Sequence, residues 1–181
     1  MALKAEIYKA VLQINDSDRQ YYNSHSVTTA QHPSETNERM MMRLTAFALF
    51  ADDNLKFTKG LSAEDEPELW IKNLTDDIEL WIDFGQPEER RVKKACGRSK
   101  HVVIICYGRT GPPWWEKNKQ KMNCMSNLSV KYFNVSDNDI LNSMVDKNMN
   151  LQFSIDAGQI WVSTNEKNIE ISVENWKETS K

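Results

Sequence analysis

Side chains in residues 5–13 of the chain fall on two faces with a period of two, and this pattern predicts a strand. The first predicted strand covers residues 5–13 and continues toward Ile14. Residues 15–18 (NDSD) form turns readily, and residues 19–30 predict the return strand. We therefore expect an antiparallel hairpin at the start of the chain.

The spacing of apolar residues then changes to that of a helix. This helix is predicted to begin within residues 32–35, with either a Ser34 cap or Pro33 in its first turn, and to run to about Ala51. Glu35 and Glu38 lie near its start, where acidic side chains suit the helix dipole. The predicted apolar face is formed by residues at helical spacing, namely Met41, Leu44, Thr45, Ala48 and Leu49.

Residues 52–72 give a less regular pattern. Leu55 and Phe57 predict a short strand within residues 52–60. In residues 61–72, Ser62 followed by Asp65 resembles a helix cap, whereas Pro67 followed by ELWIK favours a strand. Both alternatives stay open for this segment.

The most regular pattern covers residues 78–107. Residues 78–84 (IELWIDF) predict a strand, Gly85 predicts a turn, and Pro87 suits the first turn of a helix that runs to about Arg98. Residues 101–107 (HVVIICY) are continuously apolar, which is typical of a strand covered on both faces. Strand, helix and strand in this order predict a right-handed parallel crossover.

The rest of the chain predicts a helix starting at Pro112 and Pro113 with Trp114 or Trp115 buried, a strand at residues 128–133 and a helix at residues 137–147. Residues 151–155, 159–164 and 169–173 predict a three-stranded meander. No linker is long enough to separate two domains. The expected fold is one α+β domain over residues 1–181, with a mixed sheet flanked by helices.

Composition narrows the class of protein. The chain has 181 residues and a net charge of −3, which argues against a large, undirected basic surface. Its longest apolar run, residues 102–107, is too short to span a membrane, and the first ten residues do not resemble a signal peptide. The three cysteines lack metal-ligand spacing and are expected to be reduced thiols in a cytoplasmic protein.

Candidate chemistry is concentrated in residues 78–94 (IELWIDFGQPEERRVKK). Asp83 lies at the end of the predicted strand, and four cations follow on the helix, namely Arg90, Arg91, Lys93 and Lys94. Sites that bind a divalent metal and a phosphate use an acid and cations in this way. An edge-strand acid followed by an ordinary solvated helix face would give the same residues.

Five blocks of the sequence resemble the YaeQ family of small bacterial proteins. The blocks are MALKAEIYKA, HPSETNERMMMRL, LSAEDEPELW, IELWIDFGQPEERRVKKAC and IWVS, and they occur in family order almost from end to end. The resemblance implies a variant of the restriction-endonuclease-like PD-(D/E)XK fold with extra β strands.

The resemblance also implies candidate active-site acids. Glu38 corresponds to the acid of the first helix, Glu68 to the acid of the "PD" position, and Asp83 to the second acid of the motif. Other residues compete for the first two places, namely Glu35 for the helix acid and Glu66 or Asp65 for the "PD" acid. Such carboxylates would converge on Mg²⁺ or Mn²⁺ and would activate a water for phosphodiester cleavage.

The chain departs from the superfamily pattern at the lysine. Gly85 stands where the lysine is usual, so Lys93 or Lys94 on the following helix would have to replace it. The first hypothesis is thus a metal-dependent, nuclease-like enzyme. The alternative is a nuclease-fold protein that no longer cleaves but binds nucleic acid or a protein partner, with Arg90, Arg91 and Lys94 as nucleic-acid contacts. Substrate, sequence preference and oligomeric state cannot be predicted from the sequence.

Overall fold

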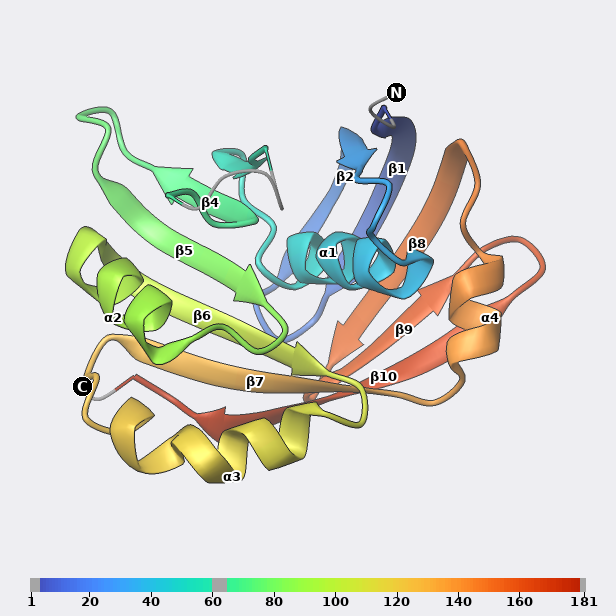
Figure 1. Cartoon of the computed structure of the whole chain (residues 1–181). Helices are drawn as coiled ribbons and strands as arrows, with labels where there is room; N and C mark the ends of the chain where they lie inside the picture. Colours follow the sequence, from blue (N-terminus) through green and yellow to red (C-terminus); the bar gives the residue numbers. More distant parts are fainter. Residues whose placement is uncertain (1–3, 60–64, 180–181) are drawn as a thin grey trace. The chain divides into compact units, whose positions relative to one another are not determined.

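The computed structural model describes residues 4–59 and 65–179, which fall into two units (Figure 1). The first unit is formed by Met1–Ala51 and Val135–Ser172, and the second by Asp52–Asn134 and Val173–Lys181. Both units contain helices and strands, so the predicted α+β class is confirmed. The single domain over residues 1–181 and the PD-(D/E)XK assignment stay predictions.

The strands of the first unit lie in the order β2-β1-β8-β9-β10. They span Glu6–Asp16 (β1), Tyr21–Gln31 (β2), Asn148–Asp156 (β8), Gln159–Ser163 (β9) and Asn168–Lys177 (β10), the last of which continues into the second unit. Strands β1 and β2 form the predicted antiparallel hairpin, and β8 pairs with β1 in parallel. Strands β8, β9 and β10 form the predicted meander.

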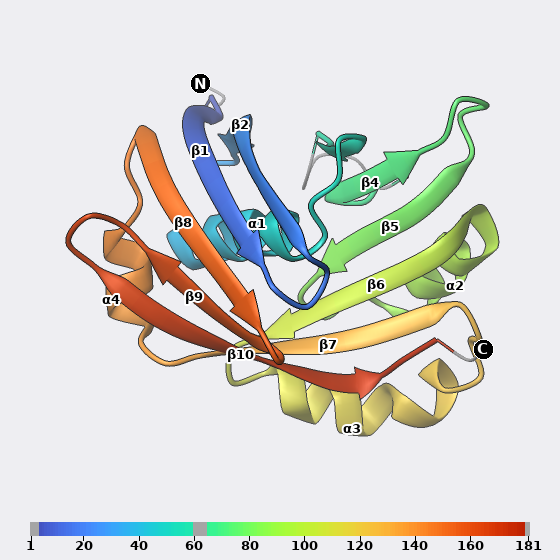
Figure 2. The same ribbon diagram turned by 180° about the vertical axis from the view of Figure 1, so that it is seen from behind.

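The sheet of the first unit buries alternate residues. In β1 these are Tyr8, Ala10, Leu12, Ile14 and Asp16, and in β8 they are Met149, Leu151, Phe153 and Ile155. Helix α1 (Asn37–Leu49) crosses one face of these strands, and Figure 2 shows the opposite face. The alternation therefore matches a sheet that packs against a helix on one face only.

Helix α1 differs from its prediction in two ways. It begins after Thr36, whose hydroxyl accepts a hydrogen bond from the backbone N–H of Arg39 at 3.1 Å, so the predicted start within residues 32–35 was too early. Met41, Leu44, Thr45 and Ala48 of the predicted face are buried, but so is every other residue from Met40 to Ala48, so burial extends all round the helix. Because Arg43 lies within this buried stretch, it needs an ionic partner inside the unit.

Helix α4 (Asn138–Ser143) is shorter than the helix predicted for residues 137–147. Asp137 caps it by accepting hydrogen bonds from the N–H groups of Asp139 and Ile140. The chain then leaves the helix, because the carbonyl of Lys147 accepts a hydrogen bond from the N–H of Lys9 in β1 at 2.9 Å. Pairing with β1 therefore replaces the last predicted helical turn.

The second unit has the strand order β10-β7-β6-β5-β4-β3. Its own strands are Leu55–Phe57 (β3), Leu69–Lys72 (β4), Ile78–Phe84 (β5), Ser99–Tyr107 (β6) and Leu128–Val135 (β7). Strands β5 and β6 pair in parallel, as the crossover pattern predicted, and β7 pairs in parallel with β6. Strands β3, β4 and β5 pair antiparallel. The segment after Pro67 forms strand β4, which is the strand alternative predicted for it. Ser62, the cap residue of the helix alternative, lies outside the described residues.

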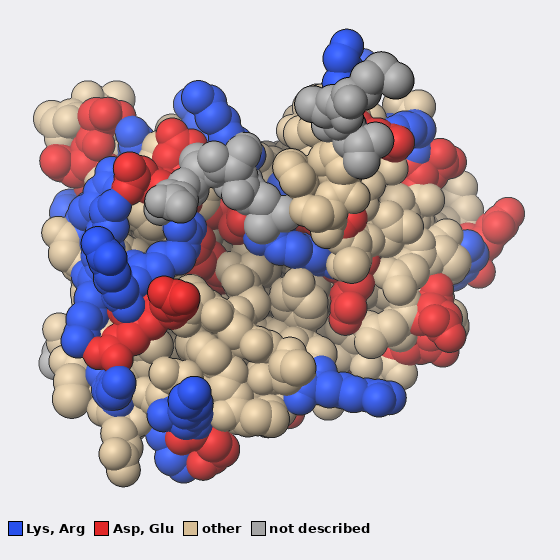
Figure 3. Space-filling view, viewed as in Figure 1, with Lys and Arg blue, Asp and Glu red and all other residues tan. Residues whose placement is uncertain are grey.

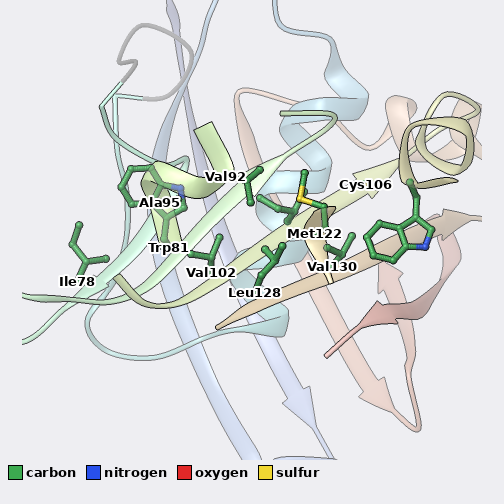
Figure 4. Packing of buried hydrophobic residues seen from close by; sticks show 11 residues of the cluster. Ile78, Trp81, Val92, Ala95, Val102, Cys106, Met122, Leu128 and Val130 are labelled. Carbon is green, nitrogen blue, oxygen red and sulfur yellow. The ribbon is translucent and has the colours of Figure 1, made fainter. Parts of the chain in front are cut away.

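Helices α2 (Glu89–Arg98) and α3 (Gly111–Met122) pack against β5, β6 and β7 (Figure 4). Val92 and Ala95 of α2 and Trp115 and Met122 of α3 join one apolar cluster. The strand residues of this cluster are Ile78, Trp81, Val102, Ile104, Cys106, Leu128 and Val130. Burial of Trp115 fulfils the expectation that one tryptophan of the pair enters the core.

Across the described ranges 4–59 and 65–179, no helix has the length and apolar character needed to cross a membrane.

Candidate functional site

The turn between β5 and α2 sets the direction of the helix. Gly85 adopts a φ of +83°, a left-handed conformation that glycine tolerates without strain, and its N–H donates to the carbonyl of Ile105 at 2.9 Å. Helix α2 begins at Glu89, two positions after Pro87, and Glu88 is its N-cap residue with an extended backbone. This start places Arg91 so that it faces back toward the end of β5.

Asp83 is buried and bound by Arg91 through two hydrogen bonds. The Arg91 Nε donates to Oδ2 at 2.8 Å, and Nη2 donates to Oδ1 at 2.9 Å. The Asp83 side chain is 4% exposed and that of Arg91 31%. Trp81 Nε1 adds a third donor to Oδ2 at 3.0 Å. The positive charge next to the strand acid is therefore an arginine, held in the bidentate geometry that matches a carboxylate.

Residues 65–68 (DEPE) form an acidic segment before β4, and the first two of them, Asp65 and Glu66, lie along α2. The Lys94 ammonium pairs with the Asp65 carboxylate, and this hydrogen bond is the largest cause that lowers the Asp65 pKa. The Asp65 carbonyl accepts from Arg98 Nη1 at 2.7 Å, and the Glu66 carbonyl accepts from Arg91 Nη2 at 2.8 Å. Asp65 and Glu66, the two alternative candidates for the "PD" acid, therefore both contact basic side chains of α2.

Lys93 has a different partner. It pairs with Glu89 one turn earlier on α2, and the same carboxylate binds Lys121 of α3 at 2.7 Å. The hydrogen bond from Lys121 is the largest cause that lowers the pKa of Glu89. The structure therefore places Lys94 with Asp65 and Lys93 with Glu89, and it is Arg91 that contacts Asp83.

Glu68 is buried and lies directly before β4. Its N–H donates to the carbonyl of Ile82 in β5 at 3.0 Å, and its carbonyl accepts from the N–H of Thr58 at 3.1 Å. The backbone of Glu68 is thereby attached to the same strand that carries Asp83. This attachment agrees with the strand alternative for the segment.

The two candidates for the helix acid lie in the first unit, Glu38 in the first turn of α1 and Glu35 before the helix begins, and they have unlike surroundings. Glu35 is buried and binds Arg43 at 2.7 and 2.8 Å and Arg39 at 3.0 Å, so it serves as the ionic partner that Arg43 requires. Glu38 is half-buried, and burial raises the pKa of its carboxyl. A desolvated carboxyl with a raised pKa is a common property of catalytic acids.

The surroundings of Asp83 do not fit a magnesium ligand as they stand. Magnesium requires carboxylate oxygens with free lone pairs, and Arg91 already supplies the positive charge that a metal would bring. Arg91 would therefore compete with a metal for the Asp83 carboxylate. Among residues 4–59 and 65–179, no group of three or more His, Cys, Asp or Glu side chains is arranged to hold a metal ion. The metal site at Glu38, Glu68 and Asp83 stays a prediction.

Helix α2 also borders two open hollows. One has a volume of about 440 Å³ and is lined by Glu88, Arg90, Arg91 and Lys94. The other has a volume of about 530 Å³ and is lined by Glu88, Glu89, Arg90 and Lys93. Figure 3 shows Lys and Arg side chains gathered over α2, with acidic side chains among them. We call Arg90, Arg91, Lys93, Lys94 and Arg98 the α2 basic surface.

Sequence reasoning identified these cations but not their partners. The Asp83–Arg91 pair depends on the orientation of α2 relative to the end of β5, which no single residue encodes. Trp81 donates to Asp83 from two positions earlier on the same strand, where the two side chains share a face. The only signal in the sequence is that an acid ending a strand is followed, eight residues later, by an arginine on the next helix.

Comparison with known proteins identifies the family. The family model described as YaeQ protein matches residues 1–173. The uncharacterized protein YaeQ of Salmonella typhi is 45% identical over 181 residues, which cover 99% of this chain and 100% of the relative. The uncharacterized protein YaeQ of Escherichia coli (strain K12) is 44% identical with the same coverage.

Solved structures agree with this match. The crystal structure of the YaeQ protein from Xanthomonas axonopodis pv. citri superposes with a TM-score of 0.90 at 41% identity, covering 98% of this chain and 100% of that one. The crystal structure of the YaeQ protein from Pseudomonas syringae gives a TM-score of 0.88 at 30% identity, covering 96% and 97%. Sequence and structure together show that this chain belongs to the YaeQ family.

Proposed function

We propose that the protein binds nucleic acid through the α2 basic surface without cleaving it. The observation that carries this proposal is the position of Arg90, which is exposed and lines both hollows beside α2. The side chain of Arg90 forms no ion pair or hydrogen bond with another residue of the described ranges. Its guanidinium can therefore bind an external anion without first losing an internal partner.

Neighbouring cations support a phosphate ligand. Arg91 and Lys94 line the first hollow beside Arg90, and Lys93 lines the second. Arginine binds phosphate in the same forked geometry in which it binds carboxylate, and lysine adds a point charge. Two adjacent hollows that share one arginine suit a ligand with repeated phosphates better than a single small anion. A nucleic-acid backbone is such a ligand.

The pairing of Asp83 favours binding over cleavage. A metal-dependent nuclease of the PD-(D/E)XK type needs this acid as a metal ligand, yet both of its oxygens accept hydrogen bonds from Arg91. The proposal is thus the non-cleaving form of the function that the resemblance to this superfamily implies.

Binding can be tested with fluorescently labelled single-stranded DNA, duplex DNA and RNA by anisotropy at ~50 and ~200 mM salt. We expect Arg90→Ala to weaken binding about three- to tenfold at the lower salt and to reduce the salt dependence by about one phosphate contact. Arg109→Ala is the matched control, because Arg109 is also an exposed arginine without a partner in the described ranges and lines neither hollow. No binding by the wild type, or equal effects of both variants, would contradict the proposal.

Cleavage is measured on the same samples with Mg²⁺ or Mn²⁺ present. The proposal expects the labelled substrates to stay intact. Cleavage by the wild type that is lost in Asp83→Asn would instead establish the metal-dependent nuclease. The binding and cleavage halves of the proposal are therefore tested separately.

A further inference from the structure

The acidic segment before β4 contacts one face of α2 at three successive positions. Arg91, Lys94 and Arg98 are separated by three and four residues and so share a helix face. Each contacts Asp65 or Glu66, through the Asp65 carboxylate for Lys94 and through backbone carbonyls for the two arginines. This face of the α2 basic surface is already covered by oxygen atoms of the chain.

The ionic contacts on this helix differ in how easily they can be exchanged. The Asp83 carboxylate is 4% exposed and is held by two bonds from Arg91, so breaking that pair would leave a buried charge. The Asp65 and Lys94 side chains are 72% and 52% exposed. Ion pairs between exposed side chains are weak and are screened by salt. Lys94 can therefore change partners, whereas Arg91 stays with Asp83.

The neighbouring backbone is anchored differently on the two sides of Glu66. From Pro67 onward the chain is attached to its neighbouring strands. The hydroxyl of Thr58, directly after β3, donates to the Pro67 carbonyl, and the N–H of Glu68 donates to the carbonyl of Ile82 in β5. Within the described ranges, the hydrogen bonds of Asp65 and Glu66 go only to α2. These hydrogen bonds thus attach Asp65 and Glu66 to α2 and not to the neighbouring strands.

We infer that Asp65 is an internal competitor of nucleic acid for Lys94, so that the acidic segment reduces the affinity of the α2 basic surface. This inference rests on the proposed function and adds regulation of the same site. An arriving phosphate takes the place of the Asp65 carboxylate on Lys94, and Arg90 provides the first contact because it has no internal partner to lose.

The test compares Asp65→Asn with wild type in the anisotropy assay at ~50 mM salt. Removing the competitor is expected to tighten binding about two- to fivefold. Asp76→Asn is the matched control, since Asp76 is likewise an exposed aspartate paired with a lysine, Lys72, away from α2. The gain should be absent from Asp76→Asn, and it should disappear when Asp65→Asn is made in a Lys94→Met background.

The outcomes separate the inference from the proposed function. If wild type binds but Asp65→Asn and Asp76→Asn behave alike, or if the gain persists without Lys94, the competition is overturned and the proposed function stands. If neither wild type nor Asp65→Asn binds any of the labelled nucleic acids, both are overturned. Binding by Asp65→Asn alone would support the competition at Lys94 but would overturn nucleic-acid binding by the wild-type protein.

Discussion

Arg91 binds both carboxylate oxygens of Asp83, at 2.8 and 2.9 Å, across the turn that joins β5 to α2. The resemblance to PD-(D/E)XK proteins predicted a metal at this acid, but the structure provides an arginine. A carboxylate that serves a metal repels its neighbours in the absence of the metal, whereas a carboxylate bound to arginine stabilises the fold. The stability of variants at Asp83 therefore distinguishes the two roles.

We expect Asp83→Asn to lower the free energy of unfolding by about 2–3 kcal/mol, because it leaves the Arg91 charge without its partner. The value lies below that of a fully buried pair because Arg91 is 31% exposed. Urea denaturation of the metal-free protein measures the change. A variant that is more stable than wild type would show that Asp83 belongs to a repulsive carboxylate cluster.

The ion pair between Glu35 and Arg43 in the first unit should contribute more to stability. Their side chains are 2% and 3% exposed, and Arg43 also donates to the Thr29 hydroxyl and the Ala30 carbonyl. We expect Arg43→Met to cost about 3–5 kcal/mol, since it leaves the Glu35 carboxylate buried with fewer donors. The same urea measurement on Lys72→Met, which breaks a pair with the exposed Asp76, should show a loss of less than about 1 kcal/mol. Similar losses in both variants would contradict this difference.

The elements of this fold were predictable where the local pattern was clear. The period of two in residues 5–13 and the strand–helix–strand pattern of residues 78–107 gave β1 and the β5–α2–β6 crossover, because each depends on residues close in sequence. The extent of α4 was mispredicted, since it depends on the pairing of Lys147 with Lys9, which is far away in sequence. Residues 61–72 were ambiguous because capping and strand signals overlap there.

The partners in the candidate site were less predictable than its residues. Moving the start of a helix by one residue rotates its side chains by about 100°. The start of α2 at Glu89 therefore decides that Arg91, and neither Lys93 nor Lys94, reaches Asp83. The sequence contains all of these cations within five residues, so the pattern alone could not choose among them.

Glu38 should give stability a characteristic pH dependence. Burial raises the pKa of Glu38 in the folded state above the ordinary 4.5 of the unfolded state. At a pH between these two values, the folded protein keeps a proton on Glu38 that the unfolded protein has released. The charged carboxyl therefore costs stability at neutral pH, and this cost disappears as the pH falls through the folded-state pKa. We expect Glu38→Gln to be more stable than wild type at pH 7, by less than about 1 kcal/mol, and equal to it near pH 4. A less stable variant at pH 7 would indicate that the Glu38 charge has a favourable partner.

The three cysteines should react with a thiol reagent at very different rates. Cys124 is exposed, Cys96 is half-buried with a pKa raised by burial, and Cys106 is fully buried with a pKa raised to about 12. Because the thiolate is the reactive form, Ellman's reagent at pH 8 should modify Cys124 first, Cys96 more slowly, and Cys106 only after unfolding in denaturant. Cys124→Ser should remove the fast phase and leave the others unchanged. Rapid modification of Cys106 in the folded protein would mean that β6 opens locally, against its position inside the apolar cluster of the second unit.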